Sequence, residues 1–480
     1  MKPYLAYTTF ALLFYMQNFI FSLFASFTFV PTILEFILIY LLILLISKTS
    51  YPKTFFTIWQ SLYLMHFSFM SFFGRVITSS DIYLFFTHLR ETYETFIYTL
   101  DIYMLAFIIS LFIYIVIFTF NFKKVGANLY MLIVLFVLVL LLNSNKTQDS
   151  SLLLLKSLTN LGSIFKEKSE IKISKKLTPL RDANVNIVLV IGESMRAREY
   201  QTQKYDMFEN YFYKTIYAGA TSTDVSVPLL INGAIKPSEI DMANNLFTLA
   251  KQNNIATAFI SVQSEKSMKY IKPYLHPKST SSHSLTAHVE DIDSYKIIAS
   301  RDDKDLVKEL KKIEKDQTNL IVLQMQGEHS PYIYYPHPKS TSSLSLTAHV
   351  DKNDDISTRY AHSMNYSNEI IIQMIEYIKT LNKESIFIFT SDHGELLGEG
   401  GSYGHNTFKE QVYRVPLVIA DSLNTENSYE DILSHNGIYN LIFYYLGYSK
   451  SIKKPQKSIR VNGTMINEED GYKTFDIISK

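Results

Sequence analysis

The sequence predicts two parts of different fold class, an α-helical membrane domain followed by an α/β domain with a mostly parallel central sheet. Apolar residues crowd into the first 143 of the 480 residues, and charged residues crowd after them. From Val185 onward, short apolar runs alternate with helical patterns. This asymmetry is typical of a membrane anchor joined to a soluble domain. We therefore divide the chain into 1–143, a linker over 144–184, and 185–480.

Five stretches of the first part are long and apolar enough to cross a bilayer. They are Tyr4–Phe24, Phe29–Ile46, Phe55–Phe73, Thr99–Phe120 and Ala127–Leu142. Basic residues occupy alternate connections, at Lys2, at Lys48 and Lys53, and at Lys123 and Lys124. The positive-inside rule then places the N-terminus in the cytoplasm. With five spans, the α/β domain lies outside the cytoplasm, in the periplasm, whereas four spans would leave it in the cytoplasm.

The linker suggests contact with a membrane surface, and the bulk composition excludes several classes of function. Ser151–Phe165 has the amphipathic pattern of a helix on a membrane surface, and the lysine-rich stretch after it is either a solvated linker or a contact with anionic headgroups. A formal net charge of +1 gives no electrostatic reason to expect nucleic-acid binding. The absence of cysteine excludes cysteine-ligated zinc, cysteine nucleophiles and disulfides.

Short apolar runs in the second part are typical of buried parallel strands. They are Asn186–Ile191, Ile255–Val262, Asn319–Met325, Ser385–Thr390 and Val415–Ala420. Helical patterns lie between them, most clearly Ser367–Lys379, where isoleucines and a methionine line one face. In a sheet of this kind the functional site is expected at the carboxyl ends of the strands.

Acidic and imidazole side chains follow two of these predicted strands. Glu193 follows the first, and Asp392 and His393 follow Ser385–Thr390. Because carboxyl ends of parallel strands meet at one edge, we expect the three side chains to converge. Two carboxylates and an imidazole suit a zinc-like ion and leave one position open. A lone strand-end acid would more simply cap a helix, so the metal hypothesis rests on the combination.

The segment Gly219–Pro228 offers hydroxyl groups for the open position. Judged from the residues alone, four of them are chemically competent: Thr221, Ser222, Thr223 and Ser226. Backbone N–H groups at a helix start favour phosphate, and metal coordination lowers the pKa of a hydroxyl. Helix capping is the simpler explanation for any of these side chains taken without the metal ligands.

Four motifs, taken in order, resemble those of membrane-anchored phosphoethanolamine transferases of the alkaline phosphatase and sulfatase superfamily. They are GESMR from Gly192, TSTDVSVP from Thr221, GEHSP from Gly327 and SDHGE from Ser391. The resemblance implies an alkaline phosphatase/sulfatase-like fold for the second part. It also implies zinc ligation by Glu193, Asp392 and His393. Thr223 would be the nucleophile and would also contact the zinc, and His329 and His405 would lie near the transferred phosphate.

The same resemblance implies a reaction and its partners. Phosphatidylethanolamine would give its phosphoethanolamine group to the threonine, and the phospho-threonine intermediate would pass it to a lipopolysaccharide acceptor, either lipid A or a core sugar. One zinc ion is expected, and a second is left open. The implied location is the inner membrane, where the partners are the lipid donor, the envelope acceptor and membrane lipids.

Three positions depart from the pattern of the lipid A–modifying members. Ala218 and Leu229 stand where cysteines are usual, and Gln324 stands where a histidine is usual. These departures leave the acceptor open. The alternative function is a phosphoglycerol transferase, or another hydrolase or transferase of the superfamily, acting on an envelope glycan. A sulfatase would need arginine where the chain has Leu230, and a non-catalytic scaffold would lack a core ligand.

The chain also contains one near-identical duplication. His276–Val289 recurs as His337–Val350, with His283 replaced by Leu344. A single copy is not the signature of a repeat fold. We interpret both segments as Ser/Thr-rich surface loops, and the role of the duplication is left open.

Overall fold

The computed structural model describes most of the chain in separate ranges. They are 2–23, 32–87, 89–122, parts of 128–158, 172–200, 208–275, 292–313, 317–333, 354–381, 383–422, 429–451, 458–466 and 471–477. The duplicated segments lie outside these residues. The chain forms two compact units. The first combines Met1–Lys166 with Leu397–Gly404, and the second combines Glu167–Leu396 with His405–Lys480.

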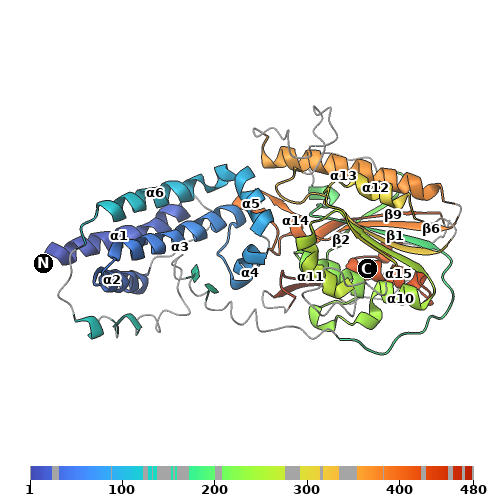
Figure 1. Ribbon diagram of the computed structural model, residues 1–480, viewed down its shortest axis with the longest axis horizontal. Coiled ribbons are helices and arrows are strands. Elements are labelled where there is room, and N and C mark those ends of the chain that lie inside the picture. Colours follow the sequence, from blue (N-terminus) through green and yellow to red (C-terminus); the bar gives the residue numbers. More distant parts are fainter. Residues whose placement is uncertain are drawn as a thin grey trace. The chain divides into compact units, whose positions relative to one another are not determined.

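The first unit is helical (Figure 1). Its helices are α1 (Lys2–Ser22), α2 (Ile33–Ser47), α3 (Pro52–Phe73), α4 (Ser79–Thr87), α5 (Leu89–Tyr98), η1 (Leu100–Tyr103) and α6 (Met104–Thr119). Among the described residues, one helix, Leu100–Thr119, is long and apolar enough to cross a membrane, and Ile33–Ser47 is a shorter apolar helix. The prediction of five spans is therefore not confirmed, and most of the fifth, 127–142, lies outside the described residues.

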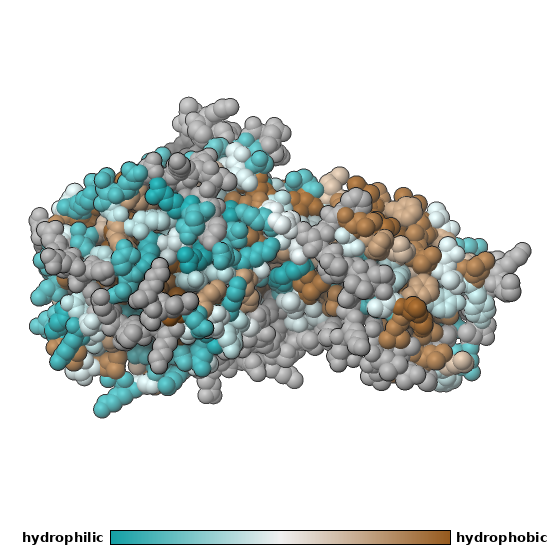
Figure 2. Space-filling view, turned by 180° about the vertical axis from the view of Figure 1, so that it is seen from behind, coloured by the Kyte–Doolittle hydropathy of each residue, from teal (hydrophilic) through white to brown (hydrophobic). Residues whose placement is uncertain are grey.

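Aromatic side chains fill the interior of this unit, and aliphatic and aromatic side chains also cover part of its outside. Phe10, Phe14 and Phe56 are fully buried between α1 and α3. The outward face of α6 is apolar over its whole length, with exposed Met104, Phe107, Ile108, Leu111, Phe112, Ile115 and Phe118. Brown, hydrophobic residues accordingly gather on the surface of this unit in Figure 2. Such a face is expected where lipid, and not water, surrounds a helix.

A seven-stranded sheet in the order β2-β9-β6-β1-β5-β3-β4 forms the centre of the second unit. Its strands are β1 (Asn186–Gly192), β2 (Phe212–Tyr217), β3 (Ala256–Ser261), β4 (Ser294–Ile297), β5 (Asn319–Gln324), β6 (Ser385–Ser391) and β9 (Arg414–Asp421). β9 is antiparallel to both of its neighbours, and the other paired strands are parallel. The predicted α/β class with a mostly parallel sheet is confirmed.

The sequence prediction differs from the structure at three strands. Val415–Ala420 was expected to be parallel, but it forms antiparallel β9, because an apolar run carries no information about direction. β2 and β4 have no counterpart in the prediction. β4 lies at an edge of the sheet with alternately exposed residues, and most residues of β2 are only partly buried, so neither is a continuous apolar run.

Helices cover both faces of the sheet (Figure 1). One face carries α12 (Lys304–Leu310) and α13 (Ile356–Lys379). The other carries α9 (Thr223–Asn232), α10 (Leu246–Gln252), α11 (Glu265–Leu275) and α15 (His435–Tyr445). The main core lies under the second group, where Leu189 of β1 shares a cluster with Leu230 of α9 and Ile442 of α15. The remaining strands and α-helix of the described residues are β7 (Leu396–Leu397), β8 (Tyr403–Gly404), α14 (Glu410–Tyr413), β10 (Ser458–Asn462) and β11 (Tyr472–Asp476). The short 3-10 helices are η2 (Arg198–Tyr200), η3 (Pro237–Glu239), η4 (Met242–Asn244), η5 (Glu399–Gly401) and η6 (Tyr429–Asp431).

The register of two central strands fixes the position of the site. β1 and β6 are adjacent and parallel, and their last residues, Gly192 and Ser391, are paired. The next residue of each chain segment is an acid, Glu193 after β1 and Asp392 after β6. The two carboxylates are thus brought to the same edge of the sheet by backbone pairing alone.

Candidate metal centre and nucleophile

The three predicted ligands converge at the carboxyl edge of the sheet. One ligand atom from each of Glu193, Asp392 and His393 lies within 4.8 Å of the others. His393 Nε2 is 3.5 Å from Glu193 Oε1 and 3.4 Å from Asp392 Oδ2. All three side chains are buried. Two buried acids and an imidazole at these distances form a compact set of donors for one cation.

Thr223 brings a hydroxyl into this group as the first residue of α9. Its Oγ1 lies 2.6 Å from Asp392 Oδ2, 3.1 Å from Glu193 Oε2 and 3.2 Å from His393 Nε2. The simpler capping role is not seen, because the N-cap residue is Ser222 and its side chain makes no capping bond.

The other candidate hydroxyls have different partners. Ser222 Oγ donates to the carbonyl of Thr464, and Ser226 Oγ donates to the carbonyl of Asp392. Among Ser222, Thr223 and Ser226, Thr223 is therefore the candidate whose hydroxyl contacts the carboxylates. The sequence alone left four candidates open, and the position of Thr223 at the start of α9 distinguishes it from Ser222 and Ser226.

The imidazole of His393 is oriented by its own backbone. Nδ1 lies 2.9 Å from the carbonyl oxygen of Gly394, which accepts only, so Nδ1 carries the proton and Nε2 presents its lone pair to the site. Gly394 is required here because a Cβ would lie 2.1 Å from the carbonyl oxygen of Gln411. The turn that aims His393 is thus closed to any larger residue.

The electrostatics of the group favour a cation. Burial, together with the neighbouring charge of Glu193, raises the pKa of Asp392 to about 6. Burial alone would lower the pKa of His393, but Asp392 and Glu193 outweigh it and raise that pKa. Two acids that repel each other in a buried place are stabilised when positive charge is placed between them.

Two residues that the sequence analysis missed hold the acids in place. Gln263 Nε2 donates to Glu193 Oε2 at 2.6 Å and to the carbonyl of Met325 at 3.1 Å. Ser194 donates from Oγ to Glu193 Oε1 and from its backbone N–H to Asp392 Oδ1, both at 3.0 Å. The signal for Gln263 was present, because it directly follows the predicted strand Ile255–Val262.

A second group of ligand atoms adjoins the first and contains His393, Glu395 and His405. The rings of His393 and His405 have centroids 4.2 Å apart. Glu395 was missed although it ends the SDHGE motif. Its Oε2 lies 3.1 Å from His405 Nδ1, and its Oε1 accepts from Tyr332 Oη at 3.1 Å. Burial would raise the pKa of Glu395, but His405 and then His393 lower it.

The two predicted phosphate-side histidines are placed differently. His405 lies beside the centre, where burial and the neighbouring His393 lower its pKa. His329 Nδ1 donates to the carbonyl of Ser330 at 2.7 Å, and His329 belongs to neither group of clustered ligand atoms among the described residues. The structure thus brings His405 to the site and leaves the role of His329 as a prediction.

Comparisons with known proteins identify the family of the α/β domain. The family model described as Sulfatase matches residues 185–448. Phosphoethanolamine transferase EptA of Helicobacter pylori is 23% identical over 303 residues, which are 56% of this chain. That alignment covers 54% of the relative, so the chain spans about half the length of this curated protein.

A solved structure resembles nearly the whole chain. It is the integral membrane protein lipooligosaccharide phosphoethanolamine transferase A (EptA) from Neisseria meningitidis, with a TM-score of 0.60. The match covers 92% of this chain and 95% of that chain at 15% identity. At 15% identity, the similarity shows a shared fold and nothing further.

Proposed function

We propose that this chain, which belongs to the sulfatase family, is a membrane-anchored transferase that moves phosphoethanolamine from phosphatidylethanolamine to lipid A or a core sugar of lipopolysaccharide. One observation carries the proposal: Thr223 Oγ1 lies within 3.2 Å of an oxygen or nitrogen of Glu193, Asp392 and His393. A single hydroxyl held by metal ligands is the arrangement that phosphoryl transfer through a covalent intermediate requires. The phosphoethanolamine transferases among the relatives supply the substrate class.

The residues present fit a divalent ion such as Zn2+. Glu193 and Asp392 offer buried carboxylates, His393 offers the Nε2 lone pair, and Thr223 offers its hydroxyl. Oxygen and nitrogen donors of this kind are common zinc ligands. When bound, the ion would lower the pKa of the Thr223 hydroxyl and balance negative charge on the phosphoryl oxygens.

The neighbouring group favours one ion over two. His393 has one lone pair to offer, because its Nδ1 donates to Gly394, so the two groups of ligand atoms compete for it. Both oxygens of Glu395 already have partners, Tyr332 and His405. Glu395 and His405 are therefore better described as a hydrogen-bonded pair beside the centre.

The transfer takes two steps, first to Thr223 and then to the acceptor. In the first, Thr223 Oγ1 gives up its proton and bonds to phosphorus, while the bond from phosphorus to the diacylglycerol oxygen breaks and that oxygen takes up a proton. In the second, an acceptor hydroxyl loses its proton and attacks phosphorus, and Thr223 Oγ1 leaves and is protonated again. We assign the exchange of these protons to His405, which is held by Glu395 next to His393, and we assign His329 a position on the same side of the phosphate.

A membrane location suits a lipid donor. The exposed apolar face of α6 and the likeness to an integral membrane transferase support an anchor in the inner membrane. We propose that the N-terminus is cytoplasmic and the α/β unit periplasmic, as the lysines of the alternate connections predict.

Removing the side-chain amide of Gln263 is expected to loosen the metal. Glu193 Oε2 would lose its 2.6 Å donor, and loss of such an outer hydrogen bond typically weakens metal binding by roughly ten- to a hundredfold. Zinc affinity of Gln263→Ala, measured by competition with a chromogenic chelator, checks this. Gln252→Ala is the matched control, since Gln252 ends α10 just before the amino end of β3. Equal affinity in the Gln263 variant and the wild type would contradict the assignment.

Mass spectrometry of envelope glycolipids tests the function as a whole. Cells with the protein are expected to carry phosphoethanolamine on lipopolysaccharide, and the fragment that bears it identifies the acceptor. Cells that carry Thr223→Ala are expected to lack it. Glycerol phosphate in place of phosphoethanolamine would instead establish the phosphoglycerol transferase, and unchanged glycolipids would refute transfer to lipopolysaccharide.

A further inference from the structure

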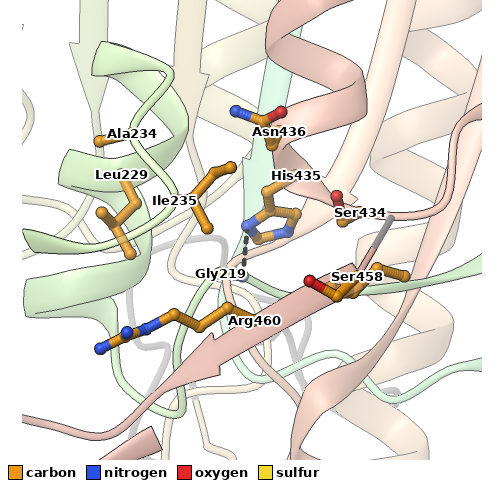
Figure 3. A pocket seen from close by; sticks show the side chains of 10 residues that line it. Gly219, Leu229, Ala234, Ile235, Ser434, His435, Asn436, Ser458 and Arg460 are labelled. Atoms are coloured by element: carbon orange, nitrogen blue, oxygen red, sulfur yellow. Dashed lines mark hydrogen bonds between the residues drawn. The ribbon is translucent and has the colours of Figure 1, made fainter. Parts of the chain in front are cut away.

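His435 is a buried histidine close to the site that the mechanism above does not use. It is the first residue of α15 and lines a cavity together with Gly219 and Ser434 (Figure 3). Its side chain is almost fully buried. The imidazole points from α15 toward the segment that precedes α9, and a dashed line in Figure 3 marks its bond to Gly219.

The two ring nitrogens have partners of opposite kind. Nδ1 accepts from the backbone N–H of Gly219 at 3.1 Å, and Nε2 lies 2.9 Å from the carbonyl oxygen of Ser391. A backbone N–H donates only and a carbonyl accepts only, so the ring is neutral with its proton on Nε2. Burial lowers the pKa of His435 to about 4, which agrees with this state.

These partners belong to the two segments that meet at Thr223. Gly219 precedes Thr223 by four residues, and Ser391 directly precedes Asp392. A third contact closes the connection on the other side of Thr223. Ser226 Oγ lies 3.2 Å from His435 Nδ1 and donates to the carbonyl of Asp392 at 2.6 Å. One ring therefore ties the start of α9 to the end of β6.

We infer that His435 is a positioning residue that sets the distance of the Thr223 hydroxyl from the metal ligands Glu193, Asp392 and His393. The inference rests on the proposed function. Thr223 Oγ1 is within hydrogen-bonding distance of three ligands at once, so a small shift of α9 changes every one of these distances. Misplacement of a reacting group by about 1 Å costs on the order of a hundredfold in rate. Three of the four proposed metal donors, Glu193, Asp392 and His393, lie outside α9, so the zinc is expected to stay bound when α9 shifts.

Rapid-quench mass spectrometry on the purified full-length protein, zinc-loaded and supplied with phosphatidylethanolamine, tests this role. The rate of phospho-threonine formation and its final amplitude are measured for wild type, His435→Asn and His435→Gln. Asparagine keeps an acceptor toward Gly219, and glutamine keeps a donor toward Ser391. Each variant is expected to form the adduct roughly ten- to a hundredfold more slowly, with full amplitude and unchanged zinc content. Ser226→Ala, which leaves the ring intact, is expected to slow the same step to a smaller extent.

The rate and the amplitude separate positioning from a merely structural role. Asn436→Ala is the matched control, because Asn436 follows His435 in α15 but bonds to the carbonyl of Gly233 at the far end of α9. It is expected to react at the wild-type rate. Variants of His435 with a wild-type rate and a reduced amplitude would overturn the inference, since only the folded fraction would have changed. Absence of any adduct on the wild-type protein would instead overturn the proposed function.

Discussion

Replacing Thr223 by alanine is expected to abolish transfer while the protein stays folded and inserted. The side chain is the group that would bond to phosphorus. Loss of a nucleophile typically lowers turnover by roughly a thousandfold or more. The fold should tolerate the change, because the hydrogen bonds of Thr223 Oγ1 go to the site residues Glu193, Asp392 and His393. Transfer from a fluorescent phosphatidylethanolamine to lipopolysaccharide, followed in detergent, measures the loss.

Two neighbouring substitutions make this result specific. Ser222→Ala removes a hydroxyl one residue away that bonds to the carbonyl of Thr464 and should leave turnover near the wild-type value. Thr223→Ser keeps the hydroxyl and should retain measurable transfer. Full activity in Thr223→Ala would refute the assigned nucleophile and make Ser222 or Ser226 the better candidate.

Replacing Asp392 by asparagine is expected to remove both the bound metal and the activity. Asparagine keeps the shape but loses the charge that faces Glu193 and His393, so the donor set offers one carboxylate instead of two. Zinc content by elemental analysis and transfer activity should fall together. Treatment of the wild-type protein with a strong chelator should have the same effect, and added Zn2+ should restore the activity.

A control substitution is available at the opposite end of the strands from the metal centre. Asp421 ends β9, which is antiparallel, and it pairs with Ile386 near the start of β6, far along the strand from Asp392. Asp421→Asn makes the same chemical change there and should leave zinc content unaltered. Turnover that survives thorough metal removal from the wild-type protein would contradict the metal hypothesis.

The sequence was most informative where buried strands end. Runs without charged residues identified β1, β3, β5 and β6, and the acids directly after β1 and β6 converge as expected because parallel pairing puts such residues at one edge. Family membership predicted from four short motifs is confirmed by the sulfatase match over residues 185–448. Both successes depend on features that are local in the sequence.

The missing parts depend on contacts between distant segments. His435 is 212 positions from Thr223 in the numbering, and no pattern around it distinguishes it from other buried histidines. Gln263 was overlooked because a glutamine after a strand is neither a metal ligand nor an acid or base, and only the fold brings it to Glu193. The direction of β9 was wrong for the same reason, since strand order is a property of the whole sheet.

Peptide mapping of the zinc-loaded protein, quenched after brief exposure to phosphatidylethanolamine, tests the central claim most directly. A phosphoethanolamine adduct is predicted on Thr223, and none should form once the metal has been stripped. An adduct on a different side chain, or one that forms equally well without metal, would contradict the assignment of this hydroxyl and its ligands.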